Sequence, residues 1–226
     1  MQEFSTFDLV SQPNDFVRKN APKQLYLEGD TTLLKEKLRV SVVGTRNPTE
    51  AGRRRARAFV EALVRHDIIV VSGLALGIDT IAHKTAIEKG GRTIAVLGTP
   101  LSQAYPAQND TLLEKIKEEH LAISQFPEGF PSKRENFPQR NRTMALISDA
   151  TVIVEASEKS GTRSQGWETL RLGRLLFLME SVADNPKLNW PKEMIQYGAQ
   201  VLTRDNLEDV LTEIPAYTSA GDEIGF

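Results

Sequence analysis

The chain has 226 residues, of which 40% are hydrophobic and 26% are charged, a balance that is typical of globular proteins and excludes a disordered chain. The formal net charge is −2, so the overall charge does not indicate a nucleic-acid-binding protein. No cysteine is present, which excludes disulfides, thiol nucleophiles and cysteine-ligated metals, and the three scattered histidines argue against a histidine-rich metal site.

The charge is distributed unevenly along the chain. Residues 44–65 contain six arginines and two glutamates, and residues 130–174 contain eight basic and five acidic side chains, whereas residues 203–226 contain one arginine and six acidic side chains. A nearly neutral total can therefore contain a basic surface and an acidic end. The arginines of 53–57 could equally be solvated side chains on a helix. On a helix, neighbouring side chains point in different directions, so these arginines cannot all face one ligand.

From residue 39 onward, apolar and β-branched segments alternate with helical patterns. The expected strands lie at 40–43, 67–72, 93–97, 121–126, 150–155 and 175–179, and a seventh could lie at 199–202. The expected helices are 48–65, 78–89, 110–119, 140–147 and 163–173. Strands that are apolar on both faces and are separated by helices favour a doubly wound α/β fold, with a mostly parallel sheet of six to seven strands and helices on both faces.

We expect three parts along the chain. Residues 1–38 form an N-terminal segment that leads into the domain, residues 39–203 form the α/β domain, and residues 204–226 form an acidic C-terminal tail. No apolar run reaches about 18 residues, and the beginning, MQEFSTFDLV, lacks the basic and apolar parts of a signal peptide. We therefore expect a cytoplasmic protein that does not associate with membranes.

Ligands of such sheets bind beyond the carboxyl ends of the strands, so the first turn there is informative. Gly44 lets the backbone approach a ligand, free N–H groups at the next helix favour an anion, and Arg46, after Thr45, offers a bidentate donor to phosphate. An ordinary tight turn with a solvated arginine would have the same sequence. The turn lacks the G-x-G-x-x-G pattern, so we expect no dinucleotide, and no other cofactor or metal is indicated.

The second turn combines Ser72 with Gly73 and Gly77, which again permit close backbone approach. Asp79 lies in the first turn of the following helix, where a carboxylate is stabilised. It could orient an arginine or accept a hydrogen bond from a sugar hydroxyl, or it could only cap the helix. His83 lies four residues later, and we expect it to form a structural pair with Asp79 rather than to act as a general base.

The segment 127–142 reads as a long, basic and aromatic loop, which is the strongest indication of nucleic acid in this sequence. Its phenylalanines could stack on a base, or Phe137 could be a buried anchor of the loop. After the fifth expected strand, a further turn rich in hydroxyl groups opens a helix. The candidate DNA- or phosphate-binding residues of these two segments are Lys133, Asn136, Phe137, Arg140, Asn141, Arg142, Lys159, Ser160, Gly161 and Thr162.

Taken together, these motifs resemble the DNA-processing protein A family, also called DprA/Smf. The resemblance rests on an ordered series from about residue 22 to 202: Leu25–Asp30, Val43–Arg46, Ser72–Asp79 with Ala82-His83, Ala95–Gly98, Tyr105-Pro106 with Asn109, Asn136–Arg142, Glu155-Ala156 and Ser160-Gly161. It implies a Rossmann-like domain that binds and protects single-stranded DNA and loads a RecA-type recombinase in natural transformation or recombination. It also implies homodimers, and DNA contacts by Arg46, Phe137, Arg140 and Arg142.

The sequence departs from the family pattern in three respects. Thr162–Glu168 replaces a small-and-hydroxyl run, Met179–Ser181 replaces a Pro-Gly turn, and the length leaves no room for the additional helical and winged-helix domains of many members. The same superfamily contains nucleotide sensors and phosphoribohydrolases, in which a Gly-Thr turn acts with a nearby glutamate. Glu168 could thus be a catalytic carboxylate, or an exposed helical residue that pairs with Arg171 or Arg174. We favour the non-enzymatic alternative.

Overall fold

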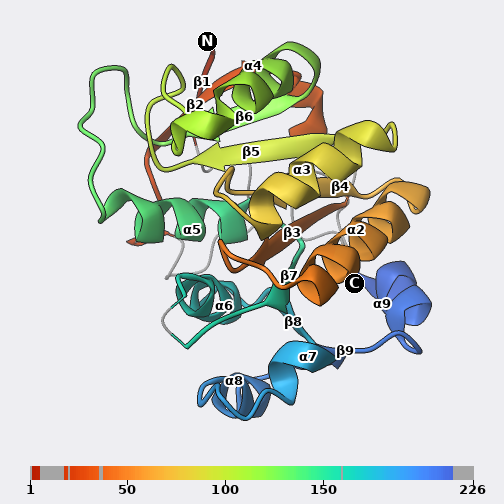
Figure 1. Cartoon of the computed structure of the whole chain (residues 1–226). Helices are drawn as coiled ribbons and strands as arrows, with labels where there is room; N and C mark the ends of the chain where they lie inside the picture. Colours follow the sequence, from red (N-terminus) through yellow and green to blue (C-terminus); the bar gives the residue numbers. More distant parts are fainter. Residues whose placement is uncertain (1, 6–17, 20, 36–37, 159, 216–226) are drawn as a thin grey trace, which may run out of the picture.

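A computed structural model describes residues 2–5, 18–19, 21–35, 38–158 and 160–215 (Figure 1). Within them, one nine-stranded sheet has the order β1-β2-β6-β5-β4-β3-β7-β8-β9. Its strands are β1 (Gln2–Ser5), β2 (Gln24–Gly29), β3 (Arg39–Gly44), β4 (Ile69–Ser72), β5 (Thr93–Leu97), β6 (Leu121–Ser124), β7 (Ala150–Glu155), β8 (Leu175–Met179) and β9 (Gln200–Leu202).

The seven strands from β3 to β9 are all parallel to one another, which confirms the Rossmann-like, doubly wound α/β fold. The sheet is wider than predicted, because β1 and β2 add two antiparallel strands beside β6. In β2 only Leu25 and Leu27 are buried, so this strand lacks the continuous apolar run by which the central strands are identified. The division of the chain at residues 38 and 203 stays a prediction.

Helices cover both faces of the sheet, and each face has its own apolar core. On one face lie α2 (Glu50–Arg65), α3 (Ile78–Glu88), α4 (Asp110–Glu119) and α9 (Leu207–Glu213), whose buried side chains meet those of the central strands. On the other lie α5 (Asn136–Leu146), α6 (Thr162–Arg171) and α8 (Pro191–Gln196). The sheet is also accompanied by the short α7 (Glu180–Ala183), η2 (Thr31–Leu34) and η3 (Ala107–Asn109). None of these is both long and apolar enough to cross a bilayer.

Local sequence explains where α2 begins and which face it buries. The Thr49 hydroxyl accepts a hydrogen bond from the Gly52 amide at 3.0 Å and so caps the first turn. Ala56, Phe59, Val60 and Leu63 recur with helical spacing and are all buried against the sheet. The arginines therefore occupy the remaining, outward part of the helix surface.

One expected boundary is wrong in a way that affects the site. Helix α5 begins at Asn136 rather than Arg140, so the end of the predicted basic loop is helical. Pro138 lies in the first turn of the helix, where the missing N–H would have no intrahelical partner. Asn136, Phe137 and Arg140 are consequently held on a helix that packs on the sheet, whereas Lys133 and Arg134 remain in the exposed loop before it.

The strand order changes direction between β3 and β7. From β3 the chain continues to β4 and β5 on one side, and from β7 it continues to β8 and β9 on the other. The connections that follow these two neighbouring strands therefore diverge and leave a crevice at their carboxyl ends. This is the position at which doubly wound folds bind their ligands.

Candidate functional site

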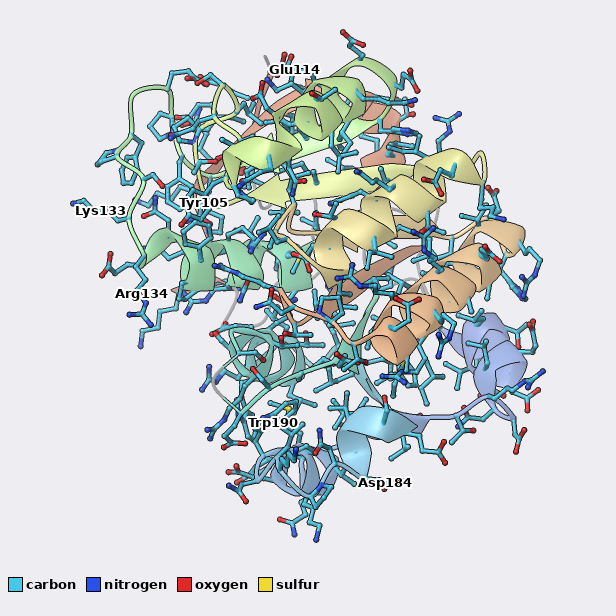
Figure 2. All side chains as sticks on the ribbon, viewed as in Figure 1. Tyr105, Glu114, Lys133, Arg134, Asp184 and Trp190 are labelled. Atoms are coloured by element: carbon cyan, nitrogen blue, oxygen red, sulfur yellow. The ribbon has the colours of Figure 1, made fainter. Side chains whose placement is uncertain are left out.

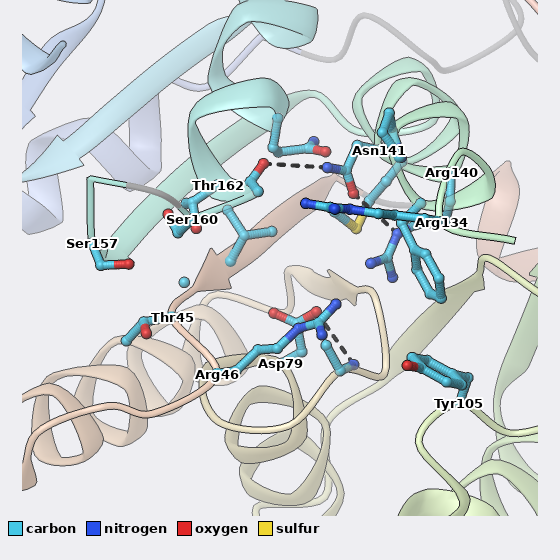
Figure 3. A pocket seen from close by; sticks show the side chains of 18 of the residues that line it. Thr45, Arg46, Asp79, Tyr105, Arg134, Arg140, Asn141, Ser157, Ser160 and Thr162 are labelled. Atoms are coloured by element: carbon cyan, nitrogen blue, oxygen red, sulfur yellow. Dashed lines mark hydrogen bonds between the residues drawn. The ribbon is translucent and has the colours of Figure 1, made fainter.

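A cavity of about 850 Å³ opens at this switch point (Figure 3). It is lined by the turns that follow β3, β4 and β7, by the loop before α5 and by α5 itself. Four basic side chains, Arg46, Lys133, Arg134 and Arg140, and one acidic side chain, Asp79, are among the residues that line it. The turns expected to converge on one edge of the sheet thus do so, and the cavity that they form is predominantly basic.

Most of the predicted binding residues come together here. Those that line the cavity are Gly44, Thr45, Arg46, Asp79, Lys133, Phe137, Arg140, Asn141, Ser160, Gly161 and Thr162. Ser72, Gly73, Gly77, Asn136 and Arg142 do not line it, and Lys159 lies outside the described residues. The buried Ser72 hydroxyl donates to the Val42 carbonyl at 2.7 Å, and the Asn136 amide donates to the Pro131 carbonyl at 3.1 Å, so both side chains hold the scaffold of the site.

Arg140 forms part of the cavity floor and is only 5% exposed. Its Nη1 donates to the carbonyls of Gly73 and, at 3.0 Å, Val96, and its Nε donates to Asn141 Oδ1 at 3.0 Å. Burial lowers the pKa of Arg140, an effect that the negative charge of Asp79 opposes and the positive charge of Arg46 reinforces. Much of the hydrogen-bonding capacity of this guanidinium is therefore used to join β4, β5 and α5.

Asp79 is the buried acidic partner of this arrangement. Its Oδ2 accepts hydrogen bonds from the backbone amides of Gly73, at 3.2 Å, and Ala75, at 3.4 Å, and thereby shapes the turn between β4 and α3. Burial raises the pKa of Asp79, while the positive charge of Arg140 and the two amides act in the opposite direction. Asp79 thus stabilises the turn and offsets the charge of Arg140.

The expected Asp79–His83 pair is not formed. His83 is fully buried, and its Nδ1 shares a hydrogen bond with Thr93 Oγ1 at 2.7 Å. The side chain is therefore directed to β5, while the Asp79 carboxylate is engaged by the turn amides. A spacing of four residues places two side chains on one face of a helix, but it does not decide which partners they find there.

Glycines in these turns make room for the protein itself. A Cβ atom on Gly73 would collide with the Arg140 guanidinium, and Gly77 has a φ of +80° and faces the carbonyl oxygens of Thr45 and Arg46. From the sequence, we expected Gly73 and Gly77 to allow a ligand to approach the backbone closely. The structure instead uses it to pack the β4–α3 turn against the β3–α2 turn, which places Arg46 at the cavity.

Glu155 was not among the predicted site residues, although it holds two of the turns together. Its carboxylate accepts hydrogen bonds from the Thr49 amide and hydroxyl, both at 2.7 Å, and from Arg55 at 2.9 Å. Its carbonyl accepts the Thr45 amide at 2.8 Å. The partners are about 100 residues away in the chain, so local sequence contained no signal for this role beyond the Glu155-Ala156 motif of the resemblance.

The remaining polar boundary of the cavity is the beginning of α6. Gly161 is the N-cap residue and provides no side-chain cap, and its carbonyl accepts a hydrogen bond from Asn141 Nδ2 at 3.4 Å. Ser160, Gly161 and Thr162, the residues at which α6 begins, line the cavity. A helix N-terminus favours an anion, so this end adds to the attraction by the basic side chains.

Aromatic residues form the opposite end. The rings of Phe137 and Tyr105 are 5.1 Å apart, and the Arg140 guanidinium carbon lies 5.9 Å from the centre of the Phe137 ring. Phe137 is half-buried, so it is at once an anchor of α5 and a surface of the cavity. Phe130 packs on Phe126 at 5.2 Å and does not line the cavity.

Glu168 and Arg142 lie together outside the cavity. Glu168 Oε2 pairs with Arg142 Nε at 3.0 Å, and Oε1 pairs with Arg171 Nη1 at 3.1 Å. The carboxylate side chain is only 7% exposed and bridges α5 and α6. This arrangement matches the pairing alternative for Glu168, although the side chain is buried rather than on the surface.

The chain was compared with known proteins. A family model described as DNA recombination-mediator protein A matches residues 11–215. Over 217 residues the chain is 31% identical to the DNA processing protein DprA of Bacillus subtilis. This alignment covers 95% of this chain and 72% of that protein. These matches confirm the resemblance inferred from the motifs.

Solved structures agree with the sequence matches. DNA processing protein A of Streptococcus pneumoniae has a TM-score of 0.80 at 32% identity and covers 95% of this chain and 75% of that one. A structure of DNA processing protein A of Helicobacter pylori, described in terms of its single-stranded DNA binding mode, has a TM-score of 0.76 at 27% identity. It covers 94% of this chain and 93% of that one.

Proposed function

Because the chain belongs to the DNA recombination-mediator protein A family, we propose that it binds single-stranded DNA in the cavity at the β3–β7 switch point. The observation that carries the proposal is the composition of that cavity, in which four basic side chains and a helix N-terminus surround a single carboxylate, beside an aromatic end. The basic side chains and the helix N-terminus attract phosphates, and the aromatic end offers a surface for nucleobases.

The arrangement favours a single strand over a duplex. Arg46, Lys133 and Arg134 are exposed at the cavity and reach a phosphate backbone from the β3 turn and from the loop before α5. Phe137 is recessed, so a base must leave its stack to contact the ring. Unpaired bases can do so at little cost, and every base has a face to offer, so we expect weak sequence preference.

Family membership also supports a proposal for the biological role. The Helicobacter pylori relative is described as binding single-stranded DNA. For this chain we infer a role in DNA uptake and recombination in the cytoplasm, in which it protects single strands and loads a RecA-type recombinase as a homodimer.

The enzymatic alternative is not favoured. Both oxygens of Glu168 are held by arginines, and Glu168 does not line the cavity. A carboxylate that stabilises a developing positive charge must face the substrate.

Titration with a fluorescein-labelled oligothymidylate tests the proposal. We expect wild-type affinity to fall steeply between about 50 and 200 mM salt, and unlabelled single strands to compete better than duplex or mononucleotide. Arg46→Ala should weaken binding about ten-fold and lower the salt slope by about one, because it removes one phosphate contact. Arg204→Ala, an exposed arginine that does not line the cavity, is the matched control. Equal affinities of both variants and wild type would contradict the proposal.

A further inference from the structure

Tyr105 is an exposed aromatic residue at the edge of the cavity. Five large hydrophobic side chains are exposed among the described residues, and Tyr105, at 47%, is the one of them that lines the cavity. Figure 3 shows its ring at one end, Ser157 and Ser160 at the other, and Arg46 and Asp79 between them. The sequence motifs had included Tyr105 only as part of the resemblance, without a role in binding.

The ring is supported from behind. One side of Tyr105 packs on Phe137 with an interplanar angle of 46°. Phe137 in turn lies over Gly98, where a Cβ atom would come within 2.7 Å of its ring. Tyr105 therefore has a packed side, held by a helix that is anchored on the sheet, and an open side. A ring fixed in this way loses little conformational entropy when a planar ligand stacks on it.

The segment that carries Tyr105 is also held by hydrogen bonds. Thr99 Oγ1 donates to the Gln103 carbonyl at 2.6 Å, and the Ser102 amide donates to Glu128 at 3.2 Å. The second bond joins this segment to the loop that contains Lys133 and Arg134. Figure 2 shows Tyr105 and these two basic residues on the same side of the molecule. An aromatic surface and two cations are thus presented together.

We propose that Tyr105 is a stacking surface for a second nucleobase, next to the nucleotide held in the cavity. The inference rests on the proposed function and deepens it, because the site would then hold two neighbouring nucleotides of one strand. The first base occupies the cavity beside Phe137, the second lies on the open side of Tyr105, and Lys133 and Arg134 attract the phosphates near them. Stacking of this kind tolerates any base.

The test compares three Tyr105 variants on the fluorescein-labelled oligothymidylate and on an abasic oligomer of the same length. Tyr105→Ala should weaken oligothymidylate binding about 5- to 100-fold, and Tyr105→Phe should stay within about two-fold of wild type, because the ring and not the hydroxyl is required. On the abasic oligomer, Tyr105→Ala should bind as wild type does. In Tyr105→Trp, oligothymidylate should quench tryptophan fluorescence beyond the change seen in wild type, since a stacked base lies on the new indole.

The outcomes separate the two proposals. If wild type does not bind oligothymidylate, the proposed function fails. If wild type binds and Tyr105→Ala binds equally well, the stacking inference alone is overturned. An equal loss on the abasic oligomer, or an equal loss in Tyr105→Phe, would also overturn it, because the role would then be structural or would belong to the hydroxyl.

Discussion

Arginine serves opposite purposes on α2 and at the switch-point cavity. Four of the five arginines of α2 form ion pairs within the protein: Arg54 with Glu50, Arg55 with Glu155, Arg57 with Glu88 and Arg65 with Glu208. At the cavity, four basic side chains face one carboxylate. The densest basic run in the sequence is therefore largely neutralised, and one of its partners, Glu208, comes from the expected acidic tail. Excess positive charge at a site depends on where the acidic residues fold, which a count along the chain does not reveal.

The largest effect is expected when the buried arginine of the cavity, Arg140, is replaced. Arg140→Ala leaves Asp79 buried without its opposing charge and leaves two backbone carbonyls without their donor. We expect the free energy of unfolding to fall by about 3 kcal/mol. Urea denaturation measures this loss. The exposed Arg46→Ala serves as the control, and it should alter DNA affinity with little change in stability. A stable Arg140→Ala that lost only DNA binding would assign Arg140 to the ligand rather than to the scaffold.

The next largest effect is expected from the buried His83, which contrasts with the buried Arg140 because the fold keeps it uncharged. Burial, with the nearby charges of His120 and Arg140, lowers the pKa of His83 from 6.5 to about 3. His83 therefore binds a proton near pH 6.5 in the unfolded chain but not in the folded chain. The folded state consequently loses stability as the pH falls below 6.5. We expect a loss of about 2 kcal/mol between pH 7 and pH 5 from this group.

Urea midpoints across that pH range measure the effect of His83. The lowered pKa of His120 acts in the same direction. His83→Gln should show a flatter profile than wild type, because the titrating group is absent. A profile as steep as that of wild type would show that His83 is not responsible.

The smallest effect is expected on the outer surface of α2. Arg57 and Glu88 are both more than half exposed, and their charged atoms are 3.8 Å apart. Arg57→Ala should therefore reduce the free energy of unfolding by about 0.5 kcal/mol or less and leave DNA affinity unchanged. Arg55→Ala should cost more, because Arg55 pairs at 2.9 Å with the largely buried Glu155. If Arg57→Ala weakened DNA binding as much as Arg46→Ala, the distinction between the two basic regions would fail.

The central strands could be predicted because their signal is local. Strands such as β5 and β7 are buried on both faces and are therefore runs of apolar and β-branched residues, which in β7 end at Glu155. The edge strand β2 buries only alternate residues, and its pairing with β6 brings together segments about 100 residues apart. Its place in the sheet was consequently not evident from its own residues.

The site shows the same division. Gly44, Arg46 and the Ser160–Thr162 turn were predicted because ligands of doubly wound sheets bind where strands end. Glu155 and Tyr105 were not predicted, because their roles depend on Thr49, Arg55 and Phe137, which lie on other elements.

By itself, the sequence determined the alternation of strands and helices, the edge of the sheet at which the cavity lies and, through its ordered motifs, the family. Only the tertiary structure decided the environment of each of several similar arginines. Arg46 lines the cavity, Arg140 is buried and donates to the Gly73 carbonyl, and Arg142 is paired with Glu168. The physical reason is that strand and helix patterns are set by neighbours along the chain. The environment of a charge, in contrast, is set by burial and by partners that only folding brings within reach.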